Sequence, residues 1–233
     1  MPNTPDTLIA QIFTSIFSRE IENDSAILAP KNCDCDEINS IAIRRFCEEI
    51  PIITLYSVDT VTKDGSDNIH NNLHPTEFLN SLNVQGFPLY KLELKLNASV
   101  MFLKNLDINS GLCNGTTLQI LSTNHKVLKV KITNGSHIGN IGLIPRIDLN
   151  SSESSLPFRM KRWQFPIRLC FAMTINKAQS RSINNLGVYL PKAVFSHGQL
   201  YVALSRAELT YRTKVMFKIM MENIQQMPST TKY

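Results

Sequence analysis

One polar turn in the last third of the chain has the residue types that bind phosphate. Thr174, Asn176, Lys177 and Gln179 follow a short apolar run within the segment FAMTINKAQSRS (171–182). Hydroxyl, amide and ammonium donors placed where a strand ends and a helix begins form a favourable site for an anion. The same polar turn also fits an ordinary helix cap, and spacing alone leaves both interpretations open.

A second segment, HGQLYVALSRA (197–207), ends in an arginine with a possible role in phosphoryl chemistry. Gln199 and Arg206 are seven residues apart, so on a helix they share one face, while Leu200 and Leu204 take the buried side. An arginine at the end of such a helix can reach across a cleft and stabilise charge on a phosphoryl group. The alternative is a surface arginine that interacts with the C-terminus of its own helix.

The elements that must position these two segments are predicted by apolar patterning. Apolar residues recur at helical spacing in three stretches, which predict helices at 7–17, 34–50 and 196–206. Four short apolar runs predict strands at 26–29, 167–171, 186–190 and 214–217. Ser196 is the expected N-cap of the last helix, and Thr7 or Asp6 that of the first. Strand, turn and helix in this order predict a unit of parallel sheet.

The middle of the chain has a different character. Residues 86–165 consist of short alternating pieces such as KLELKL (91–96) and VLKVKI (127–132), separated by turn signals such as Asn114-Gly115 and Asn134-Gly135. This spacing is typical of a small barrel or sandwich. An additional strand is expected at 52–58. The sequence therefore predicts an α/β domain that is interrupted by a β-rich insertion.

Basic residues surround two aromatic residues near the end of this insertion. Arg159, Lys161, Arg162 and Arg168 flank Trp163 and Phe165. A mixture of basic and aromatic side chains is typical of nucleic-acid binding, whereas a single tryptophan is also a common core anchor. Both interpretations stay open from the sequence.

The formal net charge of +5 is unevenly distributed. Residues 1–80 contain 5 Lys and Arg against 13 Asp and Glu, a net of −8, so the remaining 19 basic and 6 acidic residues give 81–233 a net of +13. A polyanion is expected to meet the second part. A basic surface without a partner is the alternative.

Several protein classes are disfavoured by composition. The 5 cysteines are odd in number and lack a repeated CxxC, which favours free thiols in a reducing compartment and predicts no metal site. The start of the chain lacks the pattern of a signal peptide, and no stretch of about 18 apolar residues is present. We therefore expect a soluble, intracellular protein without a membrane partner.

The two segments resemble motifs V and VI of the petite integration frequency type DNA helicases, most closely the Helitron-associated branch. The resemblance continues in order through AILAPKNCDCDEIN (26–39), which is similar to the motif IV region, and through HPTEFLNSLNVQGFP, LKLNASVMFLKNLD and GLCNGTT, which are similar to the 2B stretch. GSHIGNIGLIPRIDL and LPFRMKRWQFPIRLCFAMTINKAQ follow. The resemblance covers roughly residues 26–217.

The resemblance implies a fold and an activity. The fold is α/β, a second RecA-like helicase domain (2A) interrupted by a small β-barrel insertion (2B). The implied boundaries are 1–85 for the first part of 2A, 86–165 for 2B and 166–233 for the remainder of 2A. The implied activity is that of the C-terminal half of an ATP-dependent 5′ to 3′ DNA helicase, which unwinds DNA in repair, recombination or telomere maintenance. Nuclear localisation is the family expectation.

The resemblance also implies site residues. The cofactors of the complete family enzyme are ATP and Mg²⁺, and its partner is single-stranded DNA. By this resemblance Arg206 is the arginine finger, Gln179 and Lys177 lie on the nucleotide side of motif V, and six residues lie near the DNA backbone: Pro30, Lys31, Asn32, Thr174, Asn176 and Arg181.

Two departures from the family pattern affect activity. The sequence contains no Gly-Lys dipeptide, which a Walker A loop requires, and no Walker B segment precedes Ile27. We therefore expect no complete ATP site, no hydrolysis by the chain alone, and a separate first RecA-like domain as a partner. In motif V the family has Lys-Ser-Gln-Gly-Gln, whereas this chain has Lys177-Ala178-Gln179-Ser180-Arg181. A side chain in place of the glycine costs about 1–2 kcal/mol if the backbone there is left-handed.

Three functions follow from these observations. The first is a helicase C-terminal half, and the second is a non-catalytic nucleic-acid-binding remnant of a Helitron transposon helicase. The third is a structural barrel protein without a nucleic-acid role, which the charge distribution and the order of the motifs disfavour.

Overall fold

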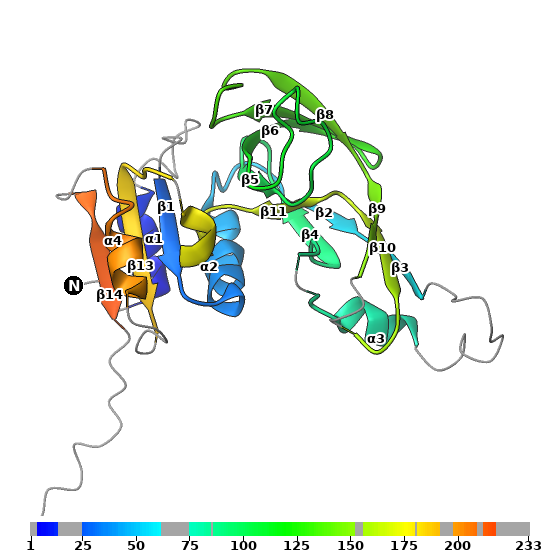
Figure 1. The fold of residues 1–233 in the computed structure, drawn as a ribbon, viewed down its shortest axis with the longest axis horizontal. Coiled ribbons are helices and arrows are strands. Elements are labelled where there is room, and N and C mark those ends of the chain that lie inside the picture. Colours follow the sequence, from blue (N-terminus) through cyan, green and yellow to red (C-terminus); the bar gives the residue numbers. More distant parts are fainter. Residues whose placement is uncertain are drawn as a thin grey trace, which may run out of the picture.

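The computed structural model describes residues 4–13, 25–61, 75–84, 86–151, 156–179, 181–191, 198–208 and 212–217. Two bodies lie side by side (Figure 1). One is a parallel sheet with helices, and the other is a group of antiparallel strands. This arrangement confirms the predicted α/β class with a β-rich insertion.

A four-stranded parallel sheet forms the first body. Its strands are ordered β12 (Ala172–Thr174), β1 (Ser25–Ala29), β13 (Asn185–Leu190) and β14 (Lys214–Phe217). The side chains of β1 are buried on both faces from Ala26 to Ala29, which is typical of a parallel sheet covered by helices on both sides. The strands predicted at 26–29, 186–190 and 214–217 are confirmed.

Helices cover both faces of this sheet. Ile27 and Ala29 of β1 share a core with α1 (Pro5–Ile12) and α2 (Asn32–Arg45). Ala26 and Leu28 point to the other face, toward α4 (Gln199–Leu204) and a 3₁₀ turn, η2 (Ile175–Ala178). The period of two along the strand therefore divides the core into two layers.

The N-cap predicted for the first helix is wrong. Thr4, not Asp6 or Thr7, caps α1, and its side-chain oxygen accepts a hydrogen bond from the backbone N–H of Thr7. Pro5 explains the shift, because proline is favoured at the first helical position, where its missing N–H is not needed. The predicted continuation from residue 14 to residue 17 lies outside the described residues.

The second body contains three antiparallel sheets. Five strands are ordered β11 (Ile167–Leu169), β5 (Ser99–Phe102), β6 (Thr117–Thr123), β7 (Val127–Ile132) and β8 (Ile141–Pro145). Three more are ordered β3 (Val58–Val61), β10 (Met160–Gln164) and β9 (Ile147–Asn150), and the last pair is β2 (Ile53–Tyr56) with β4 (Lys91–Leu94). The strands predicted near 91–96 and at 127–132 are confirmed.

Two predicted strands are interrupted in the structure, and different strands pair on either side of each break. The strand expected at 52–58 is broken at Ser57 into β2 and β3, which pair with β4 and β10 of the β-rich body. The strand expected at 167–171 is β11, which pairs with β5, and the parallel sheet resumes at Ala172. The proposed boundaries at 85/86 and 165/166 stay a prediction.

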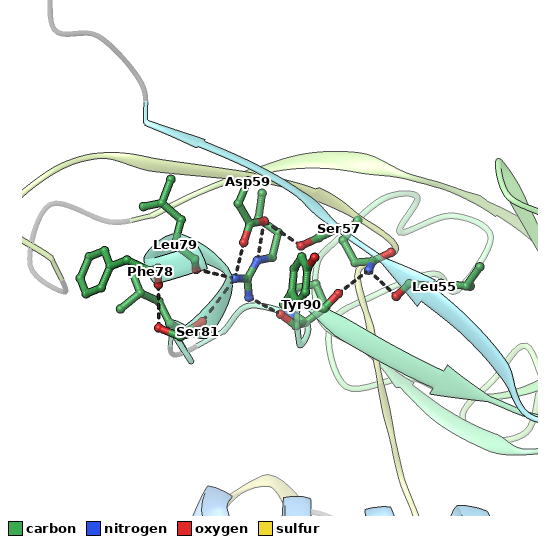
Figure 2. A network of polar contacts seen from close by, with 11 residues as sticks. Leu55, Ser57, Asp59, Phe78, Leu79, Ser81 and Tyr90 are labelled. Atoms are coloured by element: carbon green, nitrogen blue, oxygen red, sulfur yellow. Dashed lines mark hydrogen bonds and ion pairs between the residues drawn. The ribbon is translucent and has the colours of Figure 1, made fainter. Parts of the chain in front are cut away.

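A buried ion pair fixes one end of the β-rich body. Arg162 on β10 donates from Nε to Asp59 Oδ1 at 2.9 Å and from Nη2 to Asp59 Oδ2 at 2.6 Å, and both side chains are almost fully buried. Arg162 also donates to the carbonyl oxygens of Pro88, Leu79 and Leu82. Figure 2 shows this network, in which Ser57 donates to the same carboxylate at 2.7 Å.

This network has a clear structural consequence. The carbonyls of Leu79 and Leu82 belong to the end of α3 (Thr76–Ser81), so Arg162 ties that helix to β3 and β10. A bidentate arginine satisfies a buried carboxylate well because its donors form a planar fork. Arg162 is therefore not available for the nucleic-acid contact that its basic neighbourhood in the sequence suggested.

A buried lysine joins the two bodies. Lys95, which follows β4 and is 2% exposed, donates from Nζ to the carbonyl oxygens of Phe46 at 2.6 Å and of Arg44 and Cys47 at 3.3 Å. These carbonyls lie at the C-terminus of α2, where backbone acceptors lack helical partners. Burial lowers the pKa of Lys95. The lysine therefore caps a helix of one body from a strand of the other.

Replacing Lys95 with methionine is expected to lower the free energy of unfolding by about 1–3 kcal/mol, because the buried carbonyl oxygens of Phe46 and Cys47 and the partly buried one of Arg44 lose their donor. Urea unfolding monitored by circular dichroism measures the change. Lys91→Met is the matched control, since Lys91 lies on β4 but pairs with Glu93 at the surface. Equal stability of the two variants would contradict the capping role of Lys95.

Candidate functional site

The polar turn of motif V lies at the carboxyl end of the parallel sheet. Thr174 ends β12, and η2 follows it directly. Because a 3₁₀ turn repeats every three residues, Ile175 and Ala178 are buried together while Asn176 and Lys177 are exposed. The turn presents its polar side chains outward.

The motif IV residues lie at the same edge of the sheet. Ala29, the last residue of β1, is in register with Thr174, so Pro30, Lys31 and Asn32 leave the sheet beside the polar turn. Parallel strands place their carboxyl ends at one edge, where open α/β sheets bind ligands. Asn32, Thr174 and Lys177 line one small hollow there. The structure thus brings together the predicted residues of motifs IV and V.

Charged neighbours surround Lys177 on this side. Asp36 of α2 accepts a hydrogen bond from Arg168 at 2.9 Å, and both residues line the small hollow with Lys177. Although much of the Lys177 side chain is exposed, desolvation of its ammonium group in the small hollow and then the charge of Arg168 lower its pKa, and the carboxylate of Asp36 is among the opposing influences. Burial also raises the pKa of Asp36.

A larger hollow of about 470 Å³ lies between the motif V turn and the β-rich body. Lys177, Gln179 and Arg181 line it from one side, and two turns of the β-rich body line it from the other: 111 and 113–116, and 134–137. Among the described residues that line it, none is Asp or Glu. Two cations without a lining carboxylate give the hollow a positive potential, which favours an anionic ligand.

Arg181 bridges the two bodies across this hollow. Its guanidinium donates to the carbonyl oxygen of Gly115 and also contacts the thiol of Cys170. Burial raises the pKa of Cys170, so this thiol stays protonated at neutral pH. One face of Arg181 is therefore engaged by protein, and its predicted contact with DNA phosphate stays a prediction. Ser180 lies outside the described residues.

Arg206 lies apart from this hollow. The helix predicted at 196–206 is α4, which begins after Gly198 at φ 87° and ends at Leu204. Arg206 therefore lies in the turn beyond the helix, and the prediction that it shares a helical face with Gln199 is wrong. Ser196, the expected N-cap, lies outside the described residues.

The contacts of Arg206 are local. Its Nε donates to the carbonyl oxygen of Val202 at 3.3 Å, and its Nη2 donates to Ser205 Oγ at 3.1 Å. Within the described part of the chain, Arg206 forms no ion pair. The backbone N–H of Ile183, just beyond motif V, donates to the carbonyl oxygen of Arg206 at 2.8 Å. Motifs V and VI are thus linked through the backbone, while the guanidinium has no acidic partner there.

The sequence patterns did not identify the insertion's contribution to the site. Asn114, Asn134 and His137 line the hollow, but from the sequence they were assigned only to turns and to the 2B resemblance, without a role in the site. The Asn-Gly pairs predict tight turns. No local pattern indicates that two such turns lie opposite motif V.

The described ranges contain no group of at least 3 His, Cys, Asp or Glu side chains placed to hold a metal ion. All five cysteines are free thiols. Burial, aided by the charges of Asp36 and Asp34, raises the pKa of Cys35 to about 12, so this thiol resists the deprotonation that metal ligation requires.

The fold and the turn define a RecA-like α/β domain with a β-rich insertion. Residues 77–122 match the family model described as DNA helicase Pif1, 2B domain. The chain is 34% identical to the ATP-dependent DNA helicase PIF1 of Rattus norvegicus over 128 residues, which cover 54% of this chain and 19% of that protein. It is 26% identical to the PIF1 of Xenopus laevis over 219 residues, 89% of this chain and 30% of that protein.

Solved structures show the same fold. The Pif1 helicase from Candida albicans superposes with a TM-score of 0.61 at 20% identity, over 89% of this chain and 53% of that chain. The Bacteroides Pif1 helicase in complex with ADP-AlF3 and ssDNA gives a TM-score of 0.59 at 21% identity, over 91% of this chain and 45% of that chain.

These matches show that the chain is similar to part of the Pif1-type helicases and has the fold of that part. It spans less than a third of the length of the curated relatives named above. The Helitron branch stays a prediction. Within the part of the chain that the structure describes, no helix is long and apolar enough to cross a membrane.

Proposed function

We propose that this chain is the C-terminal half of an ATP-dependent DNA helicase that moves 5′ to 3′ and acts in DNA repair, recombination or telomere maintenance. A first RecA-like domain with Walker A and B motifs completes its ATP site, with Mg²⁺, and Arg206 reaches the γ-phosphate from this half. Support comes from the parallel sheet, whose carboxyl edge carries motifs IV and V together. A nuclear location is part of this proposal.

The observation that carries the DNA-binding part of the proposal is the hollow between motif V and the insertion. Lys177 and Arg181 line it together with amide side chains, and its described lining contains no carboxylate. A single strand has a phosphate at every nucleotide, so a cationic hollow at the sheet edge suits its backbone. Pro30, Lys31, Asn32, Thr174 and Asn176 extend this surface along the same edge.

Single-stranded DNA is expected to bind this chain with an affinity that falls as salt rises, because each neutralised phosphate releases counterions. Fluorescence anisotropy with a labelled oligonucleotide measures this. Lys177→Ala should weaken binding and reduce the slope of log K against log salt by about 0.7 if Lys177 contacts one phosphate. Lys214→Ala is the control, since Lys214 is an exposed residue of β14 and does not line the hollow. An affinity independent of salt would refute the phosphate contacts.

A non-catalytic nucleic-acid-binding remnant is the second candidate. The engagement of Arg181 with the carbonyl oxygen of Gly115 favours it. We infer that the chain alone binds DNA without hydrolysing ATP. Phosphate release from ATP in the presence of DNA tests this: turnover by the chain alone would exclude the remnant, and turnover restored by an added first domain would favour the helicase half.

A further inference from the structure

A partly exposed row of aromatic and arginine side chains lies on the outer face of the β-rich body. We define the aromatic strip as Tyr56, Tyr90, Arg146 and Trp163. Tyr56 is 52% exposed and Trp163 is 38% exposed. Trp163 is therefore not the core anchor that a single tryptophan suggested, and Phe165 is the aromatic residue that is buried.

Direct contacts hold this row together. The guanidinium carbon of Arg146 lies 5.0 Å from the ring centroids of both Trp163 and Phe165. Its Nη1 donates to the carbonyl oxygen of Tyr56 at 2.8 Å. The ring of Tyr56 lies 5.5 Å from that of Tyr90 at an interplanar angle of 50°. The strip is thus built in advance of any ligand, which limits the entropy lost on binding.

The strand pattern fixes the direction of Trp163. On β10 the buried Arg162 pairs in register with Asp59 of β3, and the next pair is Trp163 with Val58. Since successive side chains point to opposite faces of a sheet, the ion pair inside the body requires Trp163 to point outward. Val58 lies beside it and is 55% exposed. An apolar, aromatic surface therefore results from the same register that buries the ion pair.

The charges around the strip indicate its ligand. Lys161 pairs with Asp148 at 2.7 Å and Lys91 pairs with Glu93, so these lysines are compensated. Arg146 makes no ion pair with any described residue, and its buried Nε has no hydrogen-bond partner there. One uncompensated cation among aromatic faces complements a chain that carries both flat bases and phosphates. Proteins bind single strands by stacking bases on aromatic rings and arginine planes.

We propose that the aromatic strip stacks unpaired bases of a single-stranded nucleic acid. None of its four residues lines the hollow beside motif V, so it is a second contact surface, on the β-rich body. The aromatic strip contacts the faces of bases, whereas the hollow binds phosphates. A strand segment outside the RecA-like sheet would thereby be held by the β-rich body.

Trp163 provides the test because it is the only tryptophan of the chain. Titration with oligothymidylate is expected to quench its fluorescence as the bases stack. A strand of the same length without bases should bind with little quenching. Tyr56→Ala should weaken binding of oligothymidylate about 5- to 100-fold, given the usual strength of base stacking. Thr60→Ala on the neighbouring strand β3 is the matched control, since Thr60 is also exposed and should leave binding unchanged.

The outcomes separate this proposal from the proposed function. Binding seen by anisotropy without any quenching of Trp163 would refute base stacking on the aromatic strip, but it would leave the proposed phosphate contacts in the hollow standing. Equal quenching by the strand without bases would also overturn it. Lys177→Ala should weaken binding yet leave the quenching at saturation unchanged. Quenching by a proline-rich peptide but not by oligothymidylate would replace the proposal with a peptide-binding surface.

Discussion

Arg206→Ala is expected to reduce DNA-stimulated ATP hydrolysis by at least about 10³-fold in a protein that joins this chain to a first RecA-like domain. An arginine that contacts the transferring phosphoryl group stabilises charge that develops in the transition state, and this is its usual magnitude. The assay is phosphate release under saturating ATP and single-stranded DNA. Affinity for the oligonucleotide should stay nearly unchanged, because Arg206 does not line the hollow beside motif V.

The local contacts of Arg206 make this result interpretable. Its side chain hydrogen-bonds only within residues 202–205 in the described structure, so truncation removes little of the fold. Ser205→Ala is the matched control, since it removes the hydroxyl that Arg206 contacts but keeps the guanidinium. Arg206→Lys should also be defective, because a lysine cannot reproduce the planar fork. Full hydrolysis by Arg206→Ala would remove the arginine-finger assignment.

Arg162→Met is expected to lower the free energy of unfolding by about 3–5 kcal/mol. The substitution leaves the carboxylate of Asp59 buried without its partner, and an uncompensated buried charge is strongly destabilising. Three carbonyl oxygens at Pro88, Leu79 and Leu82 lose a donor at the same time. Urea denaturation followed by far-ultraviolet circular dichroism measures the loss.

Two further variants identify the cause of that loss. Asp59→Leu combined with Arg162→Met should recover much of the stability, because replacing both members of a buried pair with apolar residues is often neutral. Lys161→Ala, one residue away on β10, should cost less than about 1 kcal/mol since its pair with Asp148 is exposed. If Lys161→Ala proved as destabilising as Arg162→Met, strand disruption rather than the buried charge would be responsible.

Much of the fold follows from local patterns. The buried strand β1, the helix α2 and the alternating strand β7 are each specified by apolar spacing that a single segment contains. The order of the motifs also indicated a RecA-like domain with an insertion, because each motif is a continuous run of residues. Strand partners were harder to predict: β2 and β3 have ordinary strand patterns that do not state which sheet they join.

In the candidate site, too, local features were predicted from the sequence and long-range contacts were not. Thr174, Lys177 and Gln179 were predicted from residue types within one short segment, and the structure places Thr174 with Asn32 at one edge of the sheet. The turns at 113–116 and 134–137, which form the other wall of the hollow, were not assigned to the site. Their position depends on the packing of the insertion against the parallel sheet, which Lys95 and Arg181 help to hold.

The sequence by itself determined the α/β class, the β-rich insertion and the polar residue types of the motif V turn, because these depend on residue type and short-range periodicity. The tertiary structure alone decided which basic residues meet solvent. Arg162 is buried against Asp59, and Trp163 faces outward beside Arg146, although the two are neighbours in the chain. The physical reason is register: partner strands from distant segments determine which face of β10 is buried, and alternation then sends adjacent side chains in opposite directions.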